Sequence, residues 1–287
     1  MYKYKRYIII IIAFILLSIP SNVKVFANFE KMPFYDLQPK DLVCRSAFYT
    51  TYSSSSDERK SNIELASKSL NNVIIDVNAE FSFNKFVGVR SEKNGYKKAK
   101  IILDGEFVDG VGGGVCQVST TLYNAILLSG LKVIEYHPHS LPVGYIAPSF
   151  DAMVSSYADL KFINDTHNPI ILKTFTDGNV IRIEVWGEKS PYKYERESIV
   201  TGEIIAPKEQ EKYDDEGNYP DLYEGDKLVV KYSKNGLTSE GYIIAKINGK
   251  IKQVKKIRKD KYNAQCGLIV YGKATKENVE NNLETKE

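Results

Sequence analysis

The sequence predicts an α+β fold: a β-rich domain with a glycine-rich turn that leads into a cysteine-bearing helix, followed by a small all-β module. Short strand-like runs separated by Asn-Gly and Asp-Gly turns recur along the chain. Clear helical spacing of apolar residues occurs near 63–70 and 118–129. After Gly187 the composition shifts and strand-like runs follow one another. With 43% hydrophobic and 26% charged residues, the chain has the composition of a globular protein.

Residues 1–27 have the pattern of a secretory signal, with a basic start, an apolar run over 8–19 and Val-Phe-Ala before a cleavage point. The apolar run is shorter than the roughly 20 residues that span a membrane. An uncleaved anchor is the alternative, and only in that case do we expect contact with the membrane. Residues 28–43 predict a linker. We therefore expect the mature protein to work outside the cytoplasm.

The first domain is expected over residues 44–187. A polar run can cap a helix that ends near Leu70, and Asp104-Gly105 favours the tight turn of a hairpin. The second helix ends at Gly130, because glycine readily takes the left-handed conformation that stops a helix. Strands are expected at 73–75, 133–137, 160–163, 170–175 and 180–186.

The all-β module is expected over residues 200–273, and residues 274–287 are expected to be a disordered tail. Hairpin turns are expected at 234–236 and 248–249, where Asn-Gly occurs. The strands of the module are expected at 227–232, 241–247, 250–258 and 268–271.

Charge is unevenly distributed within this module. Residues 209–226 include eight acids, whereas residues 246–261 include eight bases and one acid. The basic stretch could attract anionic polymers, or it could be a solvated strand face neutralised by the acids. The net charge of the whole chain, +3, is too small to indicate a nucleic-acid partner.

Cys116 lies at the start of the second helix, directly after Gly112-Gly113-Gly114-Val115. A helix N-terminus places free N–H groups and partial positive charge beside the sulfur, which lowers the pKa of a thiol. The same N–H groups can stabilise an oxyanion. A phosphate-binding loop is one alternative, but no lysine follows the glycines. A small buried hydrophobic cysteine is the other. The pattern favours a nucleophile.

A thiol nucleophile needs a base. His137 and His139 are separated by one proline, which favours extended backbone, and residues two apart on such a segment point to one face. Either histidine could therefore pair with Cys116, while the other contacts substrate or is structural.

A third group often orients the base. Asp151 is the first candidate for that role and Asp159 is the second, and either could instead cap a turn. A zinc site made of one cysteine and two histidines would lack a fourth ligand. Neither a metal nor a cofactor is therefore expected.

Several ungapped blocks resemble the VanW domain family. They are Phe81-Ser82-Phe83-Asn84, Val87-Gly88-Val89-Arg90, Asn94-Gly95-Tyr96, the run from Gly112 to Ala125, the run from His137 to Val143, and Asp151-Ala152. The hairpin around 234–247 and the closing run 267–272 more loosely resemble a G-five domain, a β-rich extracellular module often attached to cell-wall proteins.

The resemblance implies an exported L,D-transpeptidase that acts on peptidoglycan stem peptides and forms 3–3 cross-links through a cysteine acyl-enzyme. Carried over to this chain, the nucleophile is Cys116 and the base is His139, with Asp151 as the third catalytic residue. We expect the protein to be secreted and to lie in the cell wall or at the extracytoplasmic face of the membrane. The residues expected to bind substrate are His137, Gly113, Gly114, Gln117, Ser119, Tyr123 and Ser140.

Two other functions fit the same residues. One is a cysteine peptidase or amidase of the cell wall, and the other is a non-catalytic wall-binding protein in which Cys116 is structural. We expect the C-terminal module to affect localisation more than chemistry, because its basic stretch could attract anionic wall polymers.

Overall fold

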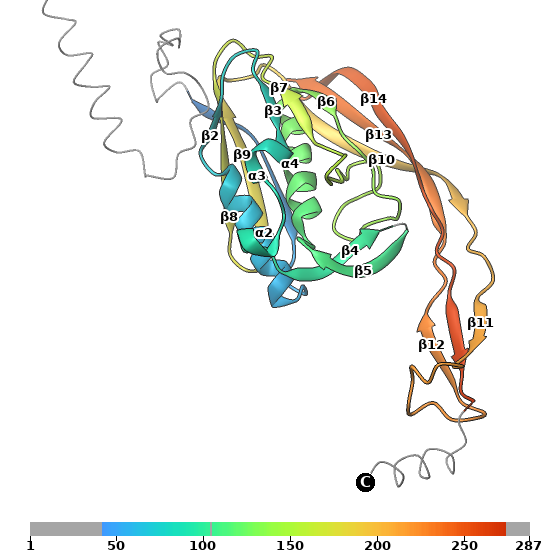
Figure 1. Ribbon diagram of the computed structural model, residues 1–287. Coiled ribbons are helices and arrows are strands. Elements are labelled where there is room, and N and C mark those ends of the chain that lie inside the picture. Colours follow the sequence, from blue (N-terminus) through green and yellow to red (C-terminus); the bar gives the residue numbers. More distant parts are fainter. Residues whose placement is uncertain (1–41, 104, 274–287) are drawn as a thin grey trace, which may run out of the picture.

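Strands dominate the structure, a computed structural model that describes residues 42–103 and 105–273 (Figure 1). The β-rich class predicted from the sequence is confirmed. The expected signal at 1–27, all but the end of the linker at 28–43, and the tail at 274–287 lie outside the described residues. Within the described ranges no helix is both long enough and apolar enough to cross a membrane.

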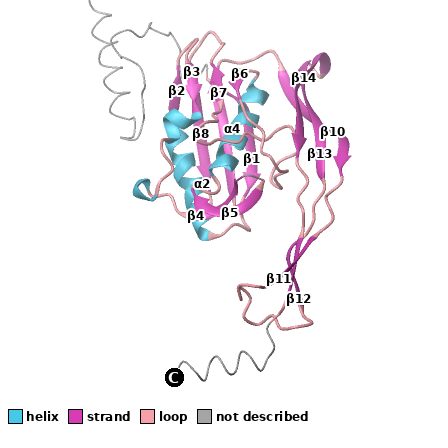
Figure 2. Ribbon diagram, turned by 45° about the vertical axis from the view of Figure 1, so that its right-hand side comes forward, coloured by secondary structure: helices cyan, strands magenta, loops and turns pink. Residues whose placement is uncertain are grey.

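An antiparallel sheet of four strands, in the order β1-β9-β8-β2, forms the framework of the first domain. Helices α2 and α4 pack against each other and against this sheet (Figure 2). The sequence pattern missed β1, whose buried positions do not alternate in a regular way. The strands are β1 (Val43–Thr51), β2 (Val73–Ile75), β8 (Ile170–Thr176) and β9 (Val180–Gly187).

Two smaller sheets complete the first domain. One has the strand order β3-β7-β6, and the other is the hairpin β4-β5 that was predicted around Asp104-Gly105. Two short helical segments follow β3. The elements are β3 (Glu80–Ser82), α3 (Phe83–Val87), the 3₁₀ helix η3 (Glu92–Asn94), β4 (Lys98–Leu103), β5 (Glu106–Val111), β6 (Lys132–Glu135) and β7 (Lys161–Ile163).

Helix α2 (Asp57–Leu70) begins at a capping serine, as the polar run predicted. The hydroxyl of Ser56 accepts a hydrogen bond from the N–H of Arg59, and two acidic residues in the first turn favour the positive end of the helix dipole. The helix buries Ile63 and Leu70, which fall on one face.

Helix α4 (Val115–Ser129) is the central helix of the molecule. It packs against β1 and β9 on one side and against β10 of the C-terminal strands on another (Figure 1). Such surroundings demand a helix that is apolar or internally satisfied all round. The helix ends at Gly130, whose φ of 80° is the left-handed conformation expected from the sequence.

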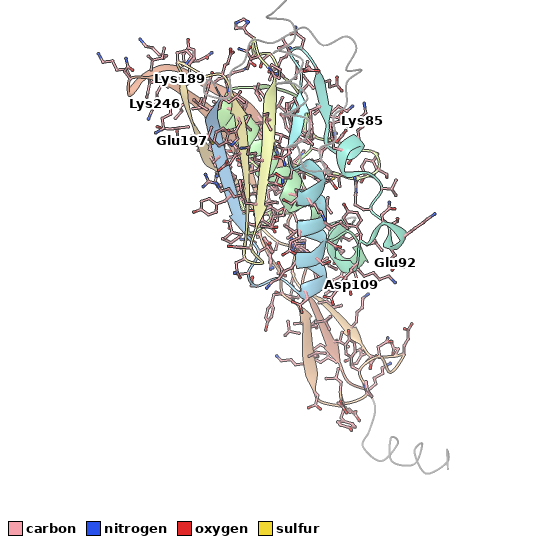
Figure 3. The ribbon with its side chains drawn as sticks, turned by 90° about the vertical axis from the view of Figure 1, so that its left-hand side faces the viewer. Lys85, Glu92, Asp109, Lys189, Glu197 and Lys246 are labelled. Carbon is pink, nitrogen blue, oxygen red and sulfur yellow. The ribbon has the colours of Figure 1, made fainter. Side chains whose placement is uncertain are left out.

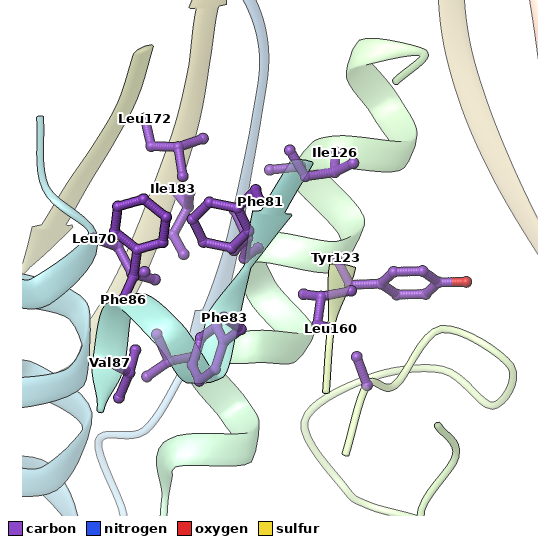
Figure 4. Close-up of a cluster of buried hydrophobic side chains, with 14 of the residues drawn as sticks. Leu70, Phe81, Phe83, Phe86, Val87, Tyr123, Ile126, Leu160, Leu172 and Ile183 are labelled. Carbon is purple, nitrogen blue, oxygen red and sulfur yellow. The ribbon is translucent and has the colours of Figure 1, made fainter. Parts of the chain in front are cut away.

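The hydrophobic core fills the space between the helices and the sheets. Figure 4 shows side chains from α2, α3, α4, β8 and β9 gathered around Phe81. The ring of Phe81 stacks on Phe86 at 4.8 Å and on Phe162 at 4.6 Å between centroids. Full burial of one such side chain contributes about 1.5–3 kcal/mol. The core therefore holds α4 firmly against the sheet.

The C-terminal strands form two three-stranded sheets, in the orders β10-β13-β14 and β11-β15-β12. The first lies beside α4, and the second lies at the far end of the molecule (Figure 1). The strands are β10 (Lys193–Ile204), β11 (Gln210–Tyr213), β12 (Lys227–Lys231), β13 (Gly236–Ile247), β14 (Lys250–Tyr262) and β15 (Leu268–Tyr271).

Two sequence-based expectations for this region need correction. The turn at 234–236 does not close a hairpin, because β12 pairs with β15 while β13 pairs with β10 and β14. The strands also begin earlier than residue 200, since β10 starts at Lys193. By contrast, Asn248-Gly249 does connect a hairpin, and both residues have the positive φ that a primed turn requires.

The sheet β10-β13-β14 packs directly on the first domain. The hydroxyls of Ser149 and Ser239 lie 2.7 Å apart, and the N–H of Asn263 donates to the carbonyl of Ser140 at 2.7 Å. Ser149 and Ser239 are fully buried. The C-terminal strands are therefore joined to the first domain by a dry, hydrogen-bonded contact.

Candidate active site

Cys116 lies in the first turn of α4, where the helix opens toward solvent. Cys116 and Leu128 are the two residues of α4 that are not buried. The sulfur accepts a hydrogen bond from the N–H of Val154 at 3.5 Å and lies 3.4 Å from the carbonyl of the same residue. An otherwise buried helix thus presents one partly accessible thiol.

The imidazole of His139 lies close enough to the Cys116 thiol for each group to shift the pKa of the other. Its Nδ1 lies 2.8 Å from Asp151 Oδ2, and its backbone N–H donates to the same oxygen at 2.6 Å. Because a carboxylate can only accept, Nδ1 carries the proton and Nε2 is the nitrogen left to face the sulfur. The structure thus brings together the three residues expected to carry the chemistry.

The three groups change one another's proton affinities. Burial alone would raise the pKa of the Cys116 thiol, but the hydrogen bond and charge of His139 outweigh burial and hold this pKa below its usual range. Burial would lower the pKa of His139, but the hydrogen bonds to Asp151 and Cys116 raise it to about 9. The lowered pKa of the thiol and the raised pKa of the imidazole both favour a thiolate beside an imidazolium.

Asp151 is held in place by the C-terminal strand β14. Its Oδ1 accepts hydrogen bonds from the hydroxyl of Tyr262 at 2.6 Å and from Arg258 Nη2 at 3.2 Å. Arg258 also donates to the Asp151 carbonyl at 2.6 Å and pairs with Asp260 at 2.6 Å. Although burial opposes ionisation, the contacts with His139 and the charge of Arg258 keep the pKa of Asp151 below its ordinary value. Asp151 is therefore a fixed carboxylate.

Sequence reasoning missed both Arg258 and Tyr262. They lie in a strand in which six of the thirteen residues are lysine and whose early positions are exposed. The available signal was the two-residue alternation of Arg258, Asp260 and Tyr262, whose side chains all turn inward. Alternation shows that a face is buried, but it does not show which residue lies opposite.

Tyr145 borders the thiol on the side of the loop that precedes Asp151. Burial and the nearby charge of Cys116 raise the pKa of its hydroxyl. The charge of Arg90 also reaches Cys116 and favours the thiolate. Neither Tyr145 nor Arg90 was expected from the sequence as a site residue.

The glycines before α4 allow three segments to pack closely. A Cβ atom on Gly113 would lie 2.7 Å from the backbone of Ala99, and one on Gly114 would lie 2.9 Å from the side chain of Ile63. Gly114 also has a φ of 108°, which favours glycine. These two glycines, expected to bind substrate, therefore act in the structure by letting α4 begin against α2 and β4.

His137 and Asp159 lie in other surroundings. Nε2 of His137 is 3.1 Å from Glu135 Oε1, and its side chain is 39% exposed, whereas His139 is 5% exposed. The segment between β6 and β7 is irregular, so the two histidines do not share a face. Asp159 accepts hydrogen bonds from Ser82 and from the N–H of Asn84, and so caps α3. His137 thus contacts Glu135 in the structure, and its role in binding substrate stays a prediction.

Three other residues expected to bind substrate are buried and already bonded within the protein. Gln117 bonds to Thr50 and Thr51, and Ser119 donates to the carbonyl of Ala152 at 2.6 Å. Tyr123 is 1% exposed. These side chains hold α4 in the fold, and their role in binding substrate stays a prediction. Ser140 is partly exposed, and its carbonyl is bonded to the C-terminal strands.

Comparisons with known proteins place this site in a family. Residues 58–186 match the family model described as VanW like protein. YoaR of Bacillus subtilis (strain 168) is 41% identical over 140 residues, which cover 48% of this chain and 46% of that protein. The vancomycin B-type resistance protein VanW of Enterococcus faecalis (strain ATCC 700802 / V583) is 30% identical over 147 residues, with 48% and 54% covered. The chain thus spans about half the length of these curated relatives.

Among solved structures, the crystal structure of HP0197-G5 and the IgA1 protease G5 domain each cover 29% of this chain at 20% identity. Their TM-scores are 0.15 and 0.20, and the matches cover 100% and 92% of those chains. Residues 58–186, the part of the chain that matches the VanW like protein model, hold Cys116, His139 and Asp151 and therefore form a VanW-like domain.

Proposed function

We propose that the protein is an exported cysteine acyltransferase that cross-links peptidoglycan stem peptides, an L,D-transpeptidase. The observation that carries the proposal is the juxtaposition of Cys116, His139 and Asp151, in which Asp151 holds Nδ1 of the imidazole at 2.8 Å and the imidazole lowers the pKa of the thiol. A nucleophile paired with a base that a third group orients is the arrangement that acyl transfer requires. The resemblance to the VanW family supplies the substrate class.

In the first half-reaction the Cys116 thiolate attacks the carbonyl carbon of the third stem residue. The bond to the terminal D-Ala breaks, and the imidazolium of His139 gives its proton to the leaving amine. A thioester on Cys116 and a neutral imidazole result. The raised pKa of His139, about 9, ensures that the proton is present at neutral pH before attack.

In the second half-reaction the side-chain amine of another stem attacks the thioester. His139 takes the proton that this amine loses, and the thiolate leaves, so the enzyme returns to its starting state. Water could take the place of the amine and would give a shortened stem with a free carboxylate. The balance between cross-linking and hydrolysis then depends on which nucleophile reaches the thioester.

The first turn of α4 offers a donor for the oxyanion. The N–H groups of Val115 and Gln117 already bond to the carbonyls of Gly112 and Gly114. The N–H of Cys116 has no hydrogen-bond partner among the described residues. We assign it to the oxyanion, a role in which one donor is worth about 10²–10³ in rate.

The expected location is the cell wall or the outer face of the membrane. The name of the Enterococcus faecalis relative links that protein to vancomycin resistance, and the secretory pattern at residues 1–27 would direct this chain outside the cytoplasm. Retention on purified walls at low and high salt tests this location.

Purified protein incubated with stem tetrapeptides tests the function, with Cys116→Ala as the control. Mass spectrometry should find stem dimers that have lost one D-Ala, and no product with the control variant. Shortened stems alone would show a hydrolase instead. If the well-folded wild-type protein forms neither product but is retained on purified walls, the protein is a non-catalytic wall-binding protein.

A further inference from the structure

An open cleft lies between strand β1 and the loop at 144–147, beside the candidate active site. Its volume is about 550 Å³. One charged residue, Arg196 of β10, is found among the lining residues, and the lining holds no acidic residue. The lining is Phe48, Tyr49, Thr50, Thr51, Gly144, Tyr145, Ile146, Ala147 and Arg196.

Arg196 has no anionic partner among the described residues. Its guanidinium stacks on the rings of Phe48 and Phe150, at 4.6 Å from each centroid, and forms no ion pair. Burial lowers its pKa to about 10. The neighbouring Glu195 is paired with Lys246 at 2.6 Å.

Glu197 cannot form an ion pair with Arg196 either, because successive side chains of a strand point to opposite faces. Its side chain is exposed (Figure 3), and in the register of the sheet Glu197 lies opposite Tyr242 of β13. A half-buried guanidinium held flat between two rings, without a carboxylate, is prepared for an anion that the protein itself does not supply.

The cleft reaches the candidate active site through Tyr145. This residue lines the cleft, and it lies close enough to Cys116 for the charge of the thiolate to raise the pKa of the tyrosine. On the opposite wall, the carbonyl of Thr51 accepts a hydrogen bond from Gln117 at 2.8 Å, one residue after Cys116. Both walls of the cleft therefore end at the first turn of α4.

Strand β1 gives this cleft a backbone edge. It is the outer strand of its sheet and pairs with β9 on one side. Such an edge can align an extended peptide, which adds itself to the sheet by main-chain hydrogen bonds. An anionic polymer fits the cleft less well, because strong binding of many phosphates needs several cations and the lining has one.

We propose that this cleft binds the stem peptide in an extended form along β1, and that Arg196 holds a carboxylate of the peptide away from the bond that Cys116 attacks. The proposal rests on the function proposed above, since it names the substrate-binding part of the same site. Arg196 would then select stems that keep this carboxylate over stems in which it is amidated.

Binding to the Cys116→Ser protein tests this without turnover. The probes are stem tetrapeptides in which each carboxylate in turn is free or amidated, and affinity is measured by calorimetry. Arg196→Met should weaken binding of the fully ionised peptide by about tenfold to a hundredfold, the usual value of a charged hydrogen bond. Amidation of one particular carboxylate should weaken binding to the protein with Arg196 by the same factor. The Arg196→Met protein should bind that amidated peptide no more weakly than it binds the fully ionised one. Arg182→Met, at a half-exposed arginine of β9 paired with Glu184, is the control and should change nothing.

Several results would overturn the proposal: equal loss for every analogue, no loss with Arg196→Met, or displacement of the peptide by millimolar orthophosphate. Arg196→Lys, which keeps the charge, should lose less than Arg196→Met. Iodoacetamide labelling of Cys116 at the wild-type rate in Arg196→Met shows that the site remains folded. Carboxylate-dependent binding without turnover in the wild-type protein would remove the proposed function but keep the cleft. Turnover with a KM that is unchanged in Arg196→Met would keep the proposed function but remove the proposed role of the cleft.

Discussion

The hydroxyl of Tyr262 donates a hydrogen bond to Asp151 Oδ1 at 2.6 Å, although the two residues are 111 positions apart. Both side chains are almost fully buried. Tyr262 is the last residue of β14, and Asp151 belongs to the VanW-like domain. The C-terminal strands therefore take part in building the candidate active site.

Replacement of this tyrosine should weaken the site more than it changes the fold. Tyr262→Phe removes the shorter of the two hydrogen bonds to Oδ1 of a buried carboxylate, which costs about 1–3 kcal/mol. With Asp151 held less firmly, Cys116 should react several-fold more slowly with iodoacetamide at pH 7. Tyr242→Phe is the matched control, because Tyr242 also bonds a carboxylate, Glu240, on the same sheet. Equal labelling rates in all three proteins would show that Tyr262 has no part in orienting the base.

Removal of the charge beside Asp151 should have a larger effect. Arg258→Met leaves a buried carboxylate without this cation and should cost about 3–5 kcal/mol of unfolding free energy. Arg258→Lys should recover part of this loss, since it restores the charge without the planar fork. Denaturant unfolding with a labelling–pH profile checks both variants. A full loss of stability with an unchanged profile in the folded fraction would indicate a purely structural role.

The two histidines should behave differently toward a thiol probe. In His139→Ala, burial acts on Cys116 without an opposing imidazolium, so the labelling curve should shift to higher pH and turnover should fall by about two to four orders of magnitude. His137→Ala should keep the low-pH curve, because His137 faces Glu135. A shift found in His137→Ala instead would reverse the assignment.

The donor half-reaction should depend on pH with a known sign. It needs the thiolate, which forms as pH rises through the lowered pKa of Cys116, and the imidazolium, which is lost as pH rises through about 9. Release of D-Ala should therefore decline above about pH 9, while thiol labelling does not. Stopped-flow measurement of both rates on one sample decides this. A D-Ala release rate that keeps rising beyond pH 10 would mean that His139 is not the proton donor.

The start of α4 should tolerate no added methyl group. Gly113→Ala places a Cβ atom 2.7 Å from the backbone of Ala99, so the protein should lose about 1–3 kcal/mol of stability. Gly144→Ala, where a Cβ atom meets open space, is the control. Equal melting temperatures for the two variants would show that β4 and α4 can move apart freely.

Several elements of this fold can be predicted from residues that lie close together in the sequence. The capped helix α2, the stop at Gly130 and the hairpin turn at Asn248-Gly249 depend on residues close in sequence, and the structure has all three. The pairing of β12 with β15 could not be read in this way, because the Asn-Gly signal at 235–236 says nothing about distant partners. Tertiary contacts decide such pairings.

The same limit applies to the site. The glycines mark Cys116 and the His-Ser pair marks His139, but the buried arginine and tyrosine of β14 lie in a strand that looks like a solvated basic face. Its lysines are largely exposed, as that interpretation requires, whereas Arg258 turns inward. The pairs formed by Lys246 and Lys256 are with Glu195 and Glu240, outside the acidic stretch at 209–226.

The structure also changes one expectation about domain roles. The C-terminal strands were expected to affect localisation more than chemistry, so a chain ending near Gly187 would cross-link normally. Such a chain lacks both Arg258 and Tyr262, the groups that satisfy Asp151 Oδ1. We now predict that it does not release D-Ala from stem tetrapeptides, measured beside the full chain. Normal release would show that Asp151 needs no support from β14.

The most direct test of the central claim is to trap the acyl-enzyme. Stem tetrapeptide is mixed with the full chain, the reaction is quenched in acid within seconds, and intact-protein and peptide mass spectrometry locate the adduct. The account predicts a thioester on Cys116 whose added mass is that of the stem without its terminal D-Ala, and no adduct in Cys116→Ala. An adduct on Cys44 or Cys266 in protein that forms product would contradict the account. Full activity of Cys116→Ala would also contradict it.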